Sequence, residues 1–147
     1  MIMKKNLLTL VMLVSALFCS AQDREREAIH QVVMNAYVEA TQNLGSIETI
    51  RSGFHPSFTM LRLLENDVKP LSLEEWIKAI EQRRKDAGGK MPRTEGKILT
   101  IDIIGSAATV KIELHREGKH IFTDYLALYK FTEGWRIVSK TFYRHPD

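Results

Sequence analysis

Two spacings of apolar residues divide the chain into a helical part and a strand-rich part. Between residues 23 and 44, apolar side chains recur every three or four positions, at Ile29, Val32, Val33, Ala36, Tyr37, Ala40 and Leu44. This spacing predicts a helix with one buried stripe, and Gly45 is expected to end it. From about residue 97 the apolar positions alternate instead, which is typical of β-strands.

The segment between these two parts carries signals for a short helix and a strand. Ser46 is expected to cap a second helix, which the His55-Pro56 pair ends because the residue before a proline avoids helical geometry. Residues 57–64 are rich in apolar and β-branched side chains and predict a strand. A turn is expected at Asn66-Asp67.

A capping box and a run of alternating segments complete the predicted elements. Ser72 and Glu75 have the capping-box spacing and predict a helix that ends at Ala87-Gly88-Gly89. Four strands follow at about residues 97–104, 108–115, 120–131 and 135–143, joined by short loops that contain glycine. The order predicts an α+β fold in which helices pack on one face of a curved antiparallel sheet.

The strand expected at residues 120–131 is apolar on both faces. One of these faces carries Tyr125, Ala127 and Tyr129. A strand of this kind lies inside a sheet rather than at its edge, and an apolar outer face needs a cover. The sequence therefore predicts a homodimer formed through the outer face of the sheet.

The N-terminus has the pattern of a secretory signal peptide. The pattern consists of Lys4 and Lys5, an apolar run from Leu7 to Phe18, and small residues before Gln22. The run is shorter than the roughly 20 apolar residues that cross a bilayer, so no stable membrane span is expected. We predict cleavage after Ala21, a signal peptide of residues 1–21 and one domain of residues 22–147.

Removal of the signal peptide changes what chemistry the remaining chain can carry. Cys19 is the only cysteine, so the mature domain would have no disulfide, thiol nucleophile or thiolate metal site. A lipid anchor on Cys19 is not expected, because the bulky Phe18 stands where lipoprotein signals carry a small residue.

The formal charge of the mature domain falls from +3 to +1, with 19 Lys and Arg against 18 Asp and Glu, which argues against nucleic acid as a partner. We expect a periplasmic or secreted protein.

The order of the elements and several short motifs point to a known superfamily. The motifs are Ala36-Tyr37-Val38, Phe54-His55-Pro56, Glu74-Glu75-Trp76, Phe122-Thr123-Asp124-Tyr125-Leu126 and Gly134-Trp135-Arg136-Ile137-Val138. Together they resemble the nuclear transport factor 2-like superfamily, which includes ketosteroid isomerases and SnoaL-like cyclases. Within it, the chain is most similar to the lumazine-binding group of exported bacterial proteins. The resemblance implies a cone-shaped α+β fold over the whole mature domain.

The resemblance also implies candidate catalytic positions. The isomerases use a tyrosine late in the first helix as an oxyanion donor, and Tyr37 matches it. Their base position falls at Arg62 and their second donor at Ala127, neither of which can do that chemistry. Asp124 and His55 are the remaining candidates for an acid or base, and no cofactor is expected.

Two of these candidates also have structural interpretations. Asp124 lies in an apolar strand, where an unpaired carboxylate is costly to bury. Arg62, Arg136 or Lys140 could form a buried ion pair with it, and the alternative is an acid or base with a raised pKa. His55 either stabilises the turn before Pro56 or acts as a base.

A cone of this kind is expected to enclose a mostly apolar pocket. The residues expected to line it are Tyr37, Phe58, Met60, Trp76, Tyr125, Ala127 and Trp135. We expect non-catalytic binding of a small hydrophobic or aromatic molecule. The alternatives are a protein-interaction module that uses the outer sheet face, and an isomerase-, cyclase- or dehydratase-like enzyme that uses Tyr37 and Asp124.

Two histidines flank the turn at residues 116–119. His115 and His120 could approach each other across this hairpin, near enough to share a metal ion. Without a pair of carboxylates nearby, such histidines are expected on the surface instead, so no metal site is predicted. The chain also lacks a Gly-rich phosphate loop, a Gly-x-Ser-x-Gly elbow and a His-Glu-x-x-His motif, which argues against nucleotide hydrolysis, serine hydrolysis and metalloproteolysis.

Overall fold

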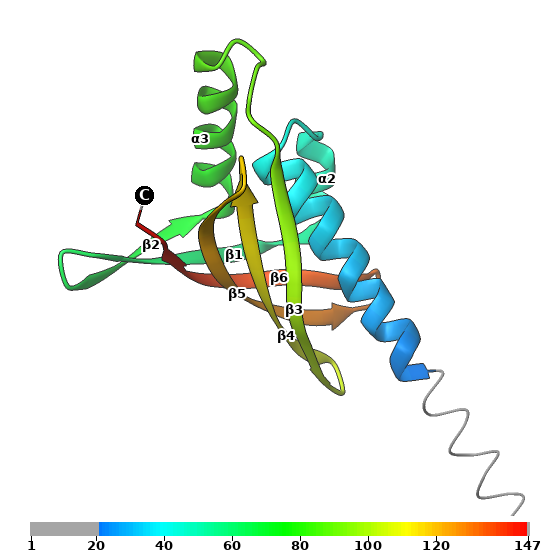
Figure 1. The fold of residues 1–147 in the computed structure, drawn as a ribbon. Helices are drawn as coiled ribbons and strands as arrows, with labels where there is room; N and C mark the ends of the chain where they lie inside the picture. Colours follow the sequence, from blue (N-terminus) through cyan, green and yellow to red (C-terminus); the bar gives the residue numbers. More distant parts are fainter. Residues whose placement is uncertain (1–20, 147) are drawn as a thin grey trace, which may run out of the picture.

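In the computed structural model, which describes residues 21–146, the helices pack against one strongly curved sheet (Figure 1). The predicted signal peptide lies outside the described residues, apart from Ala21. Within the described part of the chain, no helix is both long and apolar enough to cross a membrane.

The first helix covers residues 21–42, and its second half is wound more widely than an α-helix. This half, η1 (Val33–Gln42), is a π-helix, and the backbone N–H of Asn43 closes it by donating to the carbonyl of Val38 at 3.3 Å. The Asn43 side chain then ties the helix end to the sheet, since it donates to the carbonyl of Thr94 at 3.0 Å and accepts from the Thr94 N–H at 2.9 Å. The helix therefore ends at Gln42, two residues before the predicted end at Leu44.

Local capping signals set the starts of the two shorter helices. In α2 (Ile47–Gly53), the Ser46 side chain accepts from the N–H of Thr49 at 3.0 Å. In α3 (Leu73–Asp86), Ser72 and Glu75 form the predicted capping box. Helix α2 ends at Gly53, where a Cβ atom would lie 2.2 Å from that of Ala36. Glycine at this position therefore permits α2 to approach the first helix closely.

Six strands form the sheet, in the order β2-β1-β6-β5-β4-β3. Their bounds are β1 (Phe54–Leu64), β2 (Asp67–Ser72), β3 (Thr94–Ile104), β4 (Ala107–Arg116), β5 (Lys119–Phe131) and β6 (Gly134–Arg144). The predicted meander is confirmed for β3 to β6, which pair antiparallel with their neighbours. Two features correct the prediction: β2 is a strand that pairs with β1, and β1 runs parallel to β6, so the sheet is mixed.

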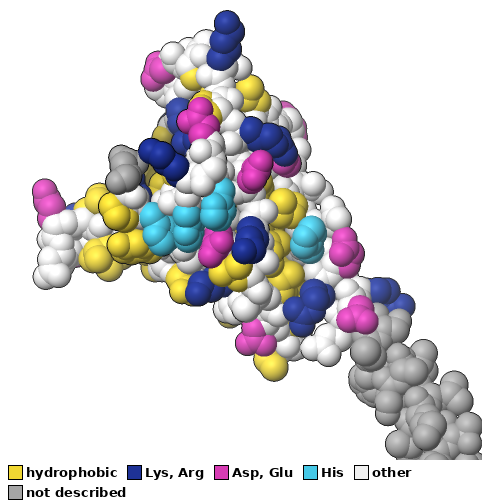
Figure 2. Space-filling model, viewed as in Figure 1, with side chains coloured by type: hydrophobic (Ala, Val, Ile, Leu, Met, Phe, Trp, Pro, Cys, Tyr) yellow, Lys and Arg dark blue, Asp and Glu magenta, His cyan; other side chains and the backbone are white. Residues whose placement is uncertain are grey.

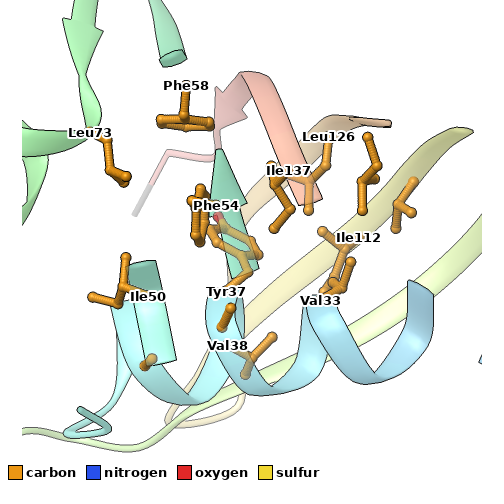
Figure 3. Close-up of a cluster of buried hydrophobic side chains, with 14 of the residues drawn as sticks. Val33, Tyr37, Val38, Ile50, Phe54, Phe58, Leu73, Ile112, Leu126 and Ile137 are labelled. Carbon is orange, nitrogen blue, oxygen red and sulfur yellow. The ribbon is translucent and has the colours of Figure 1, made fainter. Parts of the chain in front are cut away.

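The hydrophobic core lies between the helices and the inner face of the sheet. Val33 and Tyr37 point from the first helix towards Ile112, Leu126 and Ile137 on the strands (Figure 3). On β5, the residues at alternate positions, such as Asp124 and Leu126, are buried on this inner face, whereas their neighbours face outward. The outer face therefore carries tyrosines, and Tyr125 and Tyr129 are 51% and 53% exposed.

Candidate functional site

Three polar side chains from different elements meet inside the cone. Tyr37 on η1 donates its hydroxyl proton to the Asp124 carboxylate on β5. Lys140 on β6 donates to the Tyr37 hydroxyl at 2.5 Å, and its Nζ lies 2.9 Å from Oδ1 of Asp124. Of the three partners that the sequence allowed for Asp124, the structure selects Lys140. We call Tyr37, Asp124 and Lys140 the inner triad.

Strand register brings the two charged members of the inner triad together. Lys140 is the direct neighbour of Leu126 across the β5–β6 pair, and Asp124 lies two residues from Leu126 on the same face. The side chains of Asp124 and Lys140 therefore project to the same side of adjacent strands. The first helix lies over this face and supplies Tyr37 from above.

Burial dominates the electrostatics of the inner triad. It raises the pKa of Tyr37 well above the ordinary value of a tyrosine, and the negative charge of Asp124 adds to the effect. Burial also lowers the pKa of Lys140, although the Asp124 carboxylate opposes that shift. The arrangement thus holds a neutral phenol against a buried ion pair.

Aromatic rings enclose the ammonium group of the inner triad. The Lys140 Nζ atom lies 4.7 Å from the ring centroid of Tyr37, 4.8 Å from that of Phe142, 5.8 Å from that of Trp76 and 5.9 Å from that of Phe122. The faces of such rings attract a cation and offset part of the hydration that it loses on burial. Together with Asp124, they explain why a lysine is tolerated inside the core.

The inner triad is closed to solvent. Tyr37 and Asp124 are completely buried and Lys140 is 5% exposed. The Tyr37 hydroxyl already donates to Asp124 and accepts from Lys140. A substrate could reach this hydroxyl only by displacing one of these contacts, so the open oxyanion donor implied by the isomerase resemblance is not the state that the structure shows.

A cavity lies next to the inner triad, lined by residues near the ends of β1 and β6 and near the start of β5. Its volume is about 480 Å³, and its lining residues are Arg62, Leu63, Leu64, Phe122, Phe142, Tyr143 and Arg144. The rings of Phe122 and Phe142 pack edge to face, with centroids 5.6 Å apart. Because both rings also lie near the Lys140 ammonium group, they adjoin the cavity as well as the inner triad. We call this cavity the mouth cavity.

The residues expected to share one pocket lie in three different places. Tyr37, Phe58, Met60 and Trp76 are buried in the core, where Trp76 stacks on Phe58 at 5.6 Å. Tyr125 and Ala127 belong to the outer face, because β5 turns Asp124 and Leu126 inward and their neighbours therefore point outward. Trp135 lies at the start of β6 and donates from Nε1 to Glu25 at 2.7 Å. A single pocket lined by all seven residues is thus ruled out by strand alternation.

The contacts of His55 match its structural interpretation. Its Nδ1 accepts from the backbone N–H of Ser57 at 3.1 Å, and its ring stacks on Phe131 with centroids 4.7 Å apart. The first contact is local to the start of β1, and the second holds the start of β1 against the end of β5. The structure does not bring His55 together with Tyr37 and Asp124 in one hydrogen-bonded group.

The mouth cavity contains residues that the sequence analysis did not select. Phe122 and Phe142 each lie two positions from a charged member of the inner triad, Asp124 and Lys140 respectively. The period of a strand would place them on the same inner face. Arg144 follows the same alternation and is the direct neighbour of Phe122 across the β5–β6 pair.

Comparison with models of protein families shows which family the domain belongs to. The model of a family described as "putative lumazine-binding" matches residues 24–143. The chain belongs to this family. A curated relative of this lumazine-binding family domain is the aldolase FrzH of Cladobotryum sp., which is 28% identical over 111 residues, or 75% of this chain and 84% of that protein.

Solved structures place the lumazine-binding family domain in the nuclear transport factor 2-like superfamily. An NTF2-like protein from Shewanella baltica has a TM-score of 0.63 and 25% identity, covering 84% of this chain and 96% of its own. A second NTF2-like protein, from Methylobacillus flagellatus, has a TM-score of 0.63 and 24% identity, covering 84% and 94%. The predicted superfamily and α+β cone are therefore confirmed.

Proposed function

We propose that this domain binds a small, planar, negatively charged aromatic molecule in the mouth cavity, without transforming it. The observation that carries the proposal is the pairing of two aromatic rings with two arginines around one cavity of about 480 Å³. This volume lies within the roughly 300 to 1,000 Å³ of typical small-molecule sites. The family description, which refers to binding of lumazine, a planar heteroaromatic compound, supports the same class of ligand.

Each side of the mouth cavity favours one property of the ligand. Phe122 and Phe142 offer ring faces and edges that pack on a planar aromatic body. Arg62 and Arg144 supply guanidinium groups, whose planar forks match a carboxylate or a similar anion. Because Arg62 on β1 is half-buried, water screens its charge less than it screens that of an exposed arginine.

The inner triad supports a binding role over a catalytic one. A general acid or base must come within hydrogen-bond reach of the substrate. In this domain the hydrogen-bonding groups of Tyr37 and Lys140 are engaged with each other and with Asp124. Phe122 and Phe142 line the mouth cavity, whereas Tyr37, Asp124 and Lys140 are not among its lining residues.

Three probes of similar size test the proposed ligand class. We expect 2-naphthoate to raise the melting temperature at saturation, and neutral 2-naphthamide and non-aromatic decahydro-2-naphthoate to raise it much less. Calorimetric titration should show about tenfold weaker naphthoate binding in Arg144→Gln and in Phe142→Leu, a loss of about 1.4 kcal/mol each. Arg93→Gln is the matched control, because Arg93 pairs with Glu39 away from the mouth cavity. Equal binding of all three probes, or equal loss in the control, would contradict the proposal.

A catalytic alternative has one specific observation in its favour. The relative FrzH is named an aldolase, and a buried lysine with a lowered pKa is the kind of amine that can form a Schiff base with a carbonyl compound. The test is incubation with an aromatic aldehyde and borohydride, followed by peptide mapping. A reduced adduct on Lys140 would favour this alternative, and labelling confined to exposed lysines would count against it.

The outer face of the sheet supports association with a second copy of the chain. Tyr125, Tyr129 and Tyr143 are each more than half exposed there, and exposed apolar patches of this kind commonly mark protein interfaces. We expect light scattering to give the mass of a dimer, and Tyr125→Asp with Tyr129→Asp to give that of a monomer. A monomeric wild-type protein at micromolar concentration would contradict this proposal.

Export is the remaining part of the proposal. It rests on the N-terminal pattern of Lys4, Lys5 and the apolar run that follows them. The expected result is a mature protein that begins at Gln22 and is recovered from the periplasm or the medium, as N-terminal sequencing would show. Recovery of an uncleaved chain from the cytoplasm would contradict it.

A further inference from the structure

Several titratable side chains gather on the outer face of the sheet, at the β4–β5 hairpin. They are Glu113, His115, His120 and His145, which approach one another around Thr123. Figure 2 shows histidine side chains side by side on this face, with acidic and basic groups next to them. This histidine cluster lies on the opposite side of the sheet from the inner triad.

A β-bulge brings His120 to this face. Leu114 pairs with Phe122, but the next pair along the hairpin is His115 with His120, so Ile121 is an additional residue on β5. Without it, His120 would follow the alternation of Phe122 and Asp124 and point to the inner face. The extra residue places His120 directly beside His115, and the two rings stack with centroids 4.7 Å apart.

The ligand atoms of three residues converge. One nitrogen or oxygen atom each from Glu113, His115 and His120 lies within 4.8 Å of the other two. Nε2 of His115 is 3.1 Å from Oε2 of Glu113. Two ligands bound to one tetrahedral Zn²⁺ ion at about 2.0 to 2.1 Å are separated by roughly 3.3 Å, so this pair already has close to the required spacing.

Hydrogen bonds orient His120 in the manner of a metal ligand. Its Nε2 lies 3.0 Å from the carbonyl oxygen of Phe122. Because a carbonyl only accepts, Nε2 carries the proton and Nδ1 keeps its lone pair. Histidines that bind metals commonly donate their other ring N–H to a carbonyl in this way. Thr123 adds a further contact, since its hydroxyl lies 3.0 Å from Nε2 of His120 and 2.9 Å from Nε2 of His145.

We propose that Glu113, His115 and His120 bind a divalent transition-metal ion of the Zn²⁺ class on the outer face of the sheet. Imidazole nitrogens with a carboxylate oxygen form a ligand set that Zn²⁺ accepts. Three protein ligands leave a fourth position to water or to His145, whose ring centroid lies 3.8 Å from that of His120. Each ligand comes from the same chain, so the site needs no second copy and does not depend on the ligand proposed for the mouth cavity.

Calorimetric titration of the full chain tests this site. The protein is prepared without a histidine tag and stripped with EDTA, and the probes are Zn²⁺ and Ni²⁺. We expect one ion per chain. Loss of a residue that only orients a ligand commonly weakens metal binding 10- to 100-fold, so we expect loss of a ligand itself, in His115→Asn or His120→Asn, to weaken it by more than about 100-fold.

Matched variants distinguish a specific metal site from unspecific binding of the ion to surface histidines. Glu113→Gln should weaken binding at least about tenfold, whereas Glu117→Gln, an acid in the turn of the same hairpin, should bind like the wild type. His55→Asn serves as the histidine control, since His55 lies at the start of β1. Melting curves of the metal-free variants establish that each one folds. The visible spectrum of the Co²⁺ form should report tetrahedral coordination in the wild type and in the two controls, and not in the variants that lose a ligand.

Three results would overturn the proposal. The first is a wild-type protein that takes up no stoichiometric ion. The second is one ion per two chains, which would mean that the ion bridges copies. The third is equal binding by folded His120→Asn and His55→Asn, which would mean that the histidine cluster is only a hydrogen-bonded surface group.

Discussion

Tyr37, Asp124 and Lys140 are at most 5% exposed, whereas on the other side of the same sheet the side chains of Glu113 and His115 keep 21% and 30% of their surface in contact with water. Inside the cone, each polar group depends on the other two, because water cannot replace a lost partner. On the outer face, water can replace any partner, and the groups remain free to take up a ligand. Clusters of titratable side chains therefore stabilise the fold on one side of the sheet and remain available for binding on the other.

Breaking the ion pair of the inner triad should have the largest effect. Asp124→Leu leaves the Lys140 charge buried without its partner, and we expect the free energy of unfolding to fall by about 3 to 5 kcal/mol. Lys140→Met should cost a similar amount for the same reason. The double variant should recover most of the loss, because no uncompensated charge remains. Urea unfolding measures all three, and single variants as stable as the wild type would show that the pair is not electrostatically isolated from water.

Removing the hydroxyl group of the inner triad should have a smaller effect. Tyr37→Phe keeps the ring but takes away the hydrogen bonds to Asp124 and Lys140. We expect a loss of about 1 to 3 kcal/mol in the free energy of unfolding near neutral pH, the usual cost of leaving a buried polar group without its partner. The same urea experiment measures it. A loss as large as that of Asp124→Leu would mean that Tyr37 also determines how the first helix packs.

The raised pKa of Tyr37 predicts how the difference in free energy of unfolding between the wild type and Tyr37→Phe changes with pH. In the unfolded chain the tyrosine ionises near its ordinary pKa of about 10, but in the folded protein it stays protonated to higher pH. Its contribution to stability is therefore complete below about pH 10 and is lost as the pH rises towards the folded-state pKa. Above pH 10, the free energy of unfolding of the wild type should therefore fall, relative to that of Tyr37→Phe, by up to about 1.4 kcal/mol per pH unit.

Absorbance provides an independent check of the raised pKa of Tyr37. The chain has 4 tyrosines, and Tyr37 should not contribute to the phenolate signal of the folded protein near pH 10. Folded wild type and folded Tyr37→Phe should then give the same signal, whereas in guanidinium chloride the wild type should give the signal of one additional tyrosine. A difference between the folded proteins would contradict the raised pKa.

Breaking the histidine cluster should have the smallest effect on the metal-free protein. His115→Ala removes a side chain that is 30% exposed, and we expect its free energy of unfolding to stay within about 0.5 kcal/mol of the wild type. Addition of Zn²⁺ should then raise the melting temperature of the wild type and leave that of His115→Ala unchanged. A large loss without metal would mean that the outer face, like the inner triad, depends on its polar contacts.

Several elements of the fold could be predicted because their signals are local. The capping box at Ser72 and Glu75 acts within one helical turn, and the alternation along β3, β4 and β6 is visible in each strand separately. Strand β2 was missed because Asp67, Lys69 and Pro70 give it little apolar character. Its burial pattern agrees, since it lies at the edge of the sheet and is almost wholly exposed.

The candidate site was predictable residue by residue but not as an arrangement. Tyr37 and Asp124 were selected from the sequence, and Lys140 was one of three possible partners for Asp124. The expectation for Tyr125 and Ala127 failed because the sequence does not say which face of a doubly apolar strand meets the helices. The choice is made by the packing of the first helix, which lies over Asp124 and Leu126.

The family, the helix caps, the four C-terminal strands and the individual polar residues inside the apolar segments could all be inferred from the sequence. These properties depend on side chains a few positions apart. The tertiary structure alone decided that Tyr37 meets Asp124 and Lys140 across separations of 87 and 103 residues, and that a bulge at Ile121 turns His120 outward. Contacts of this kind depend on strand order, register and the inward face of each strand, and these are set only when the whole core packs at once.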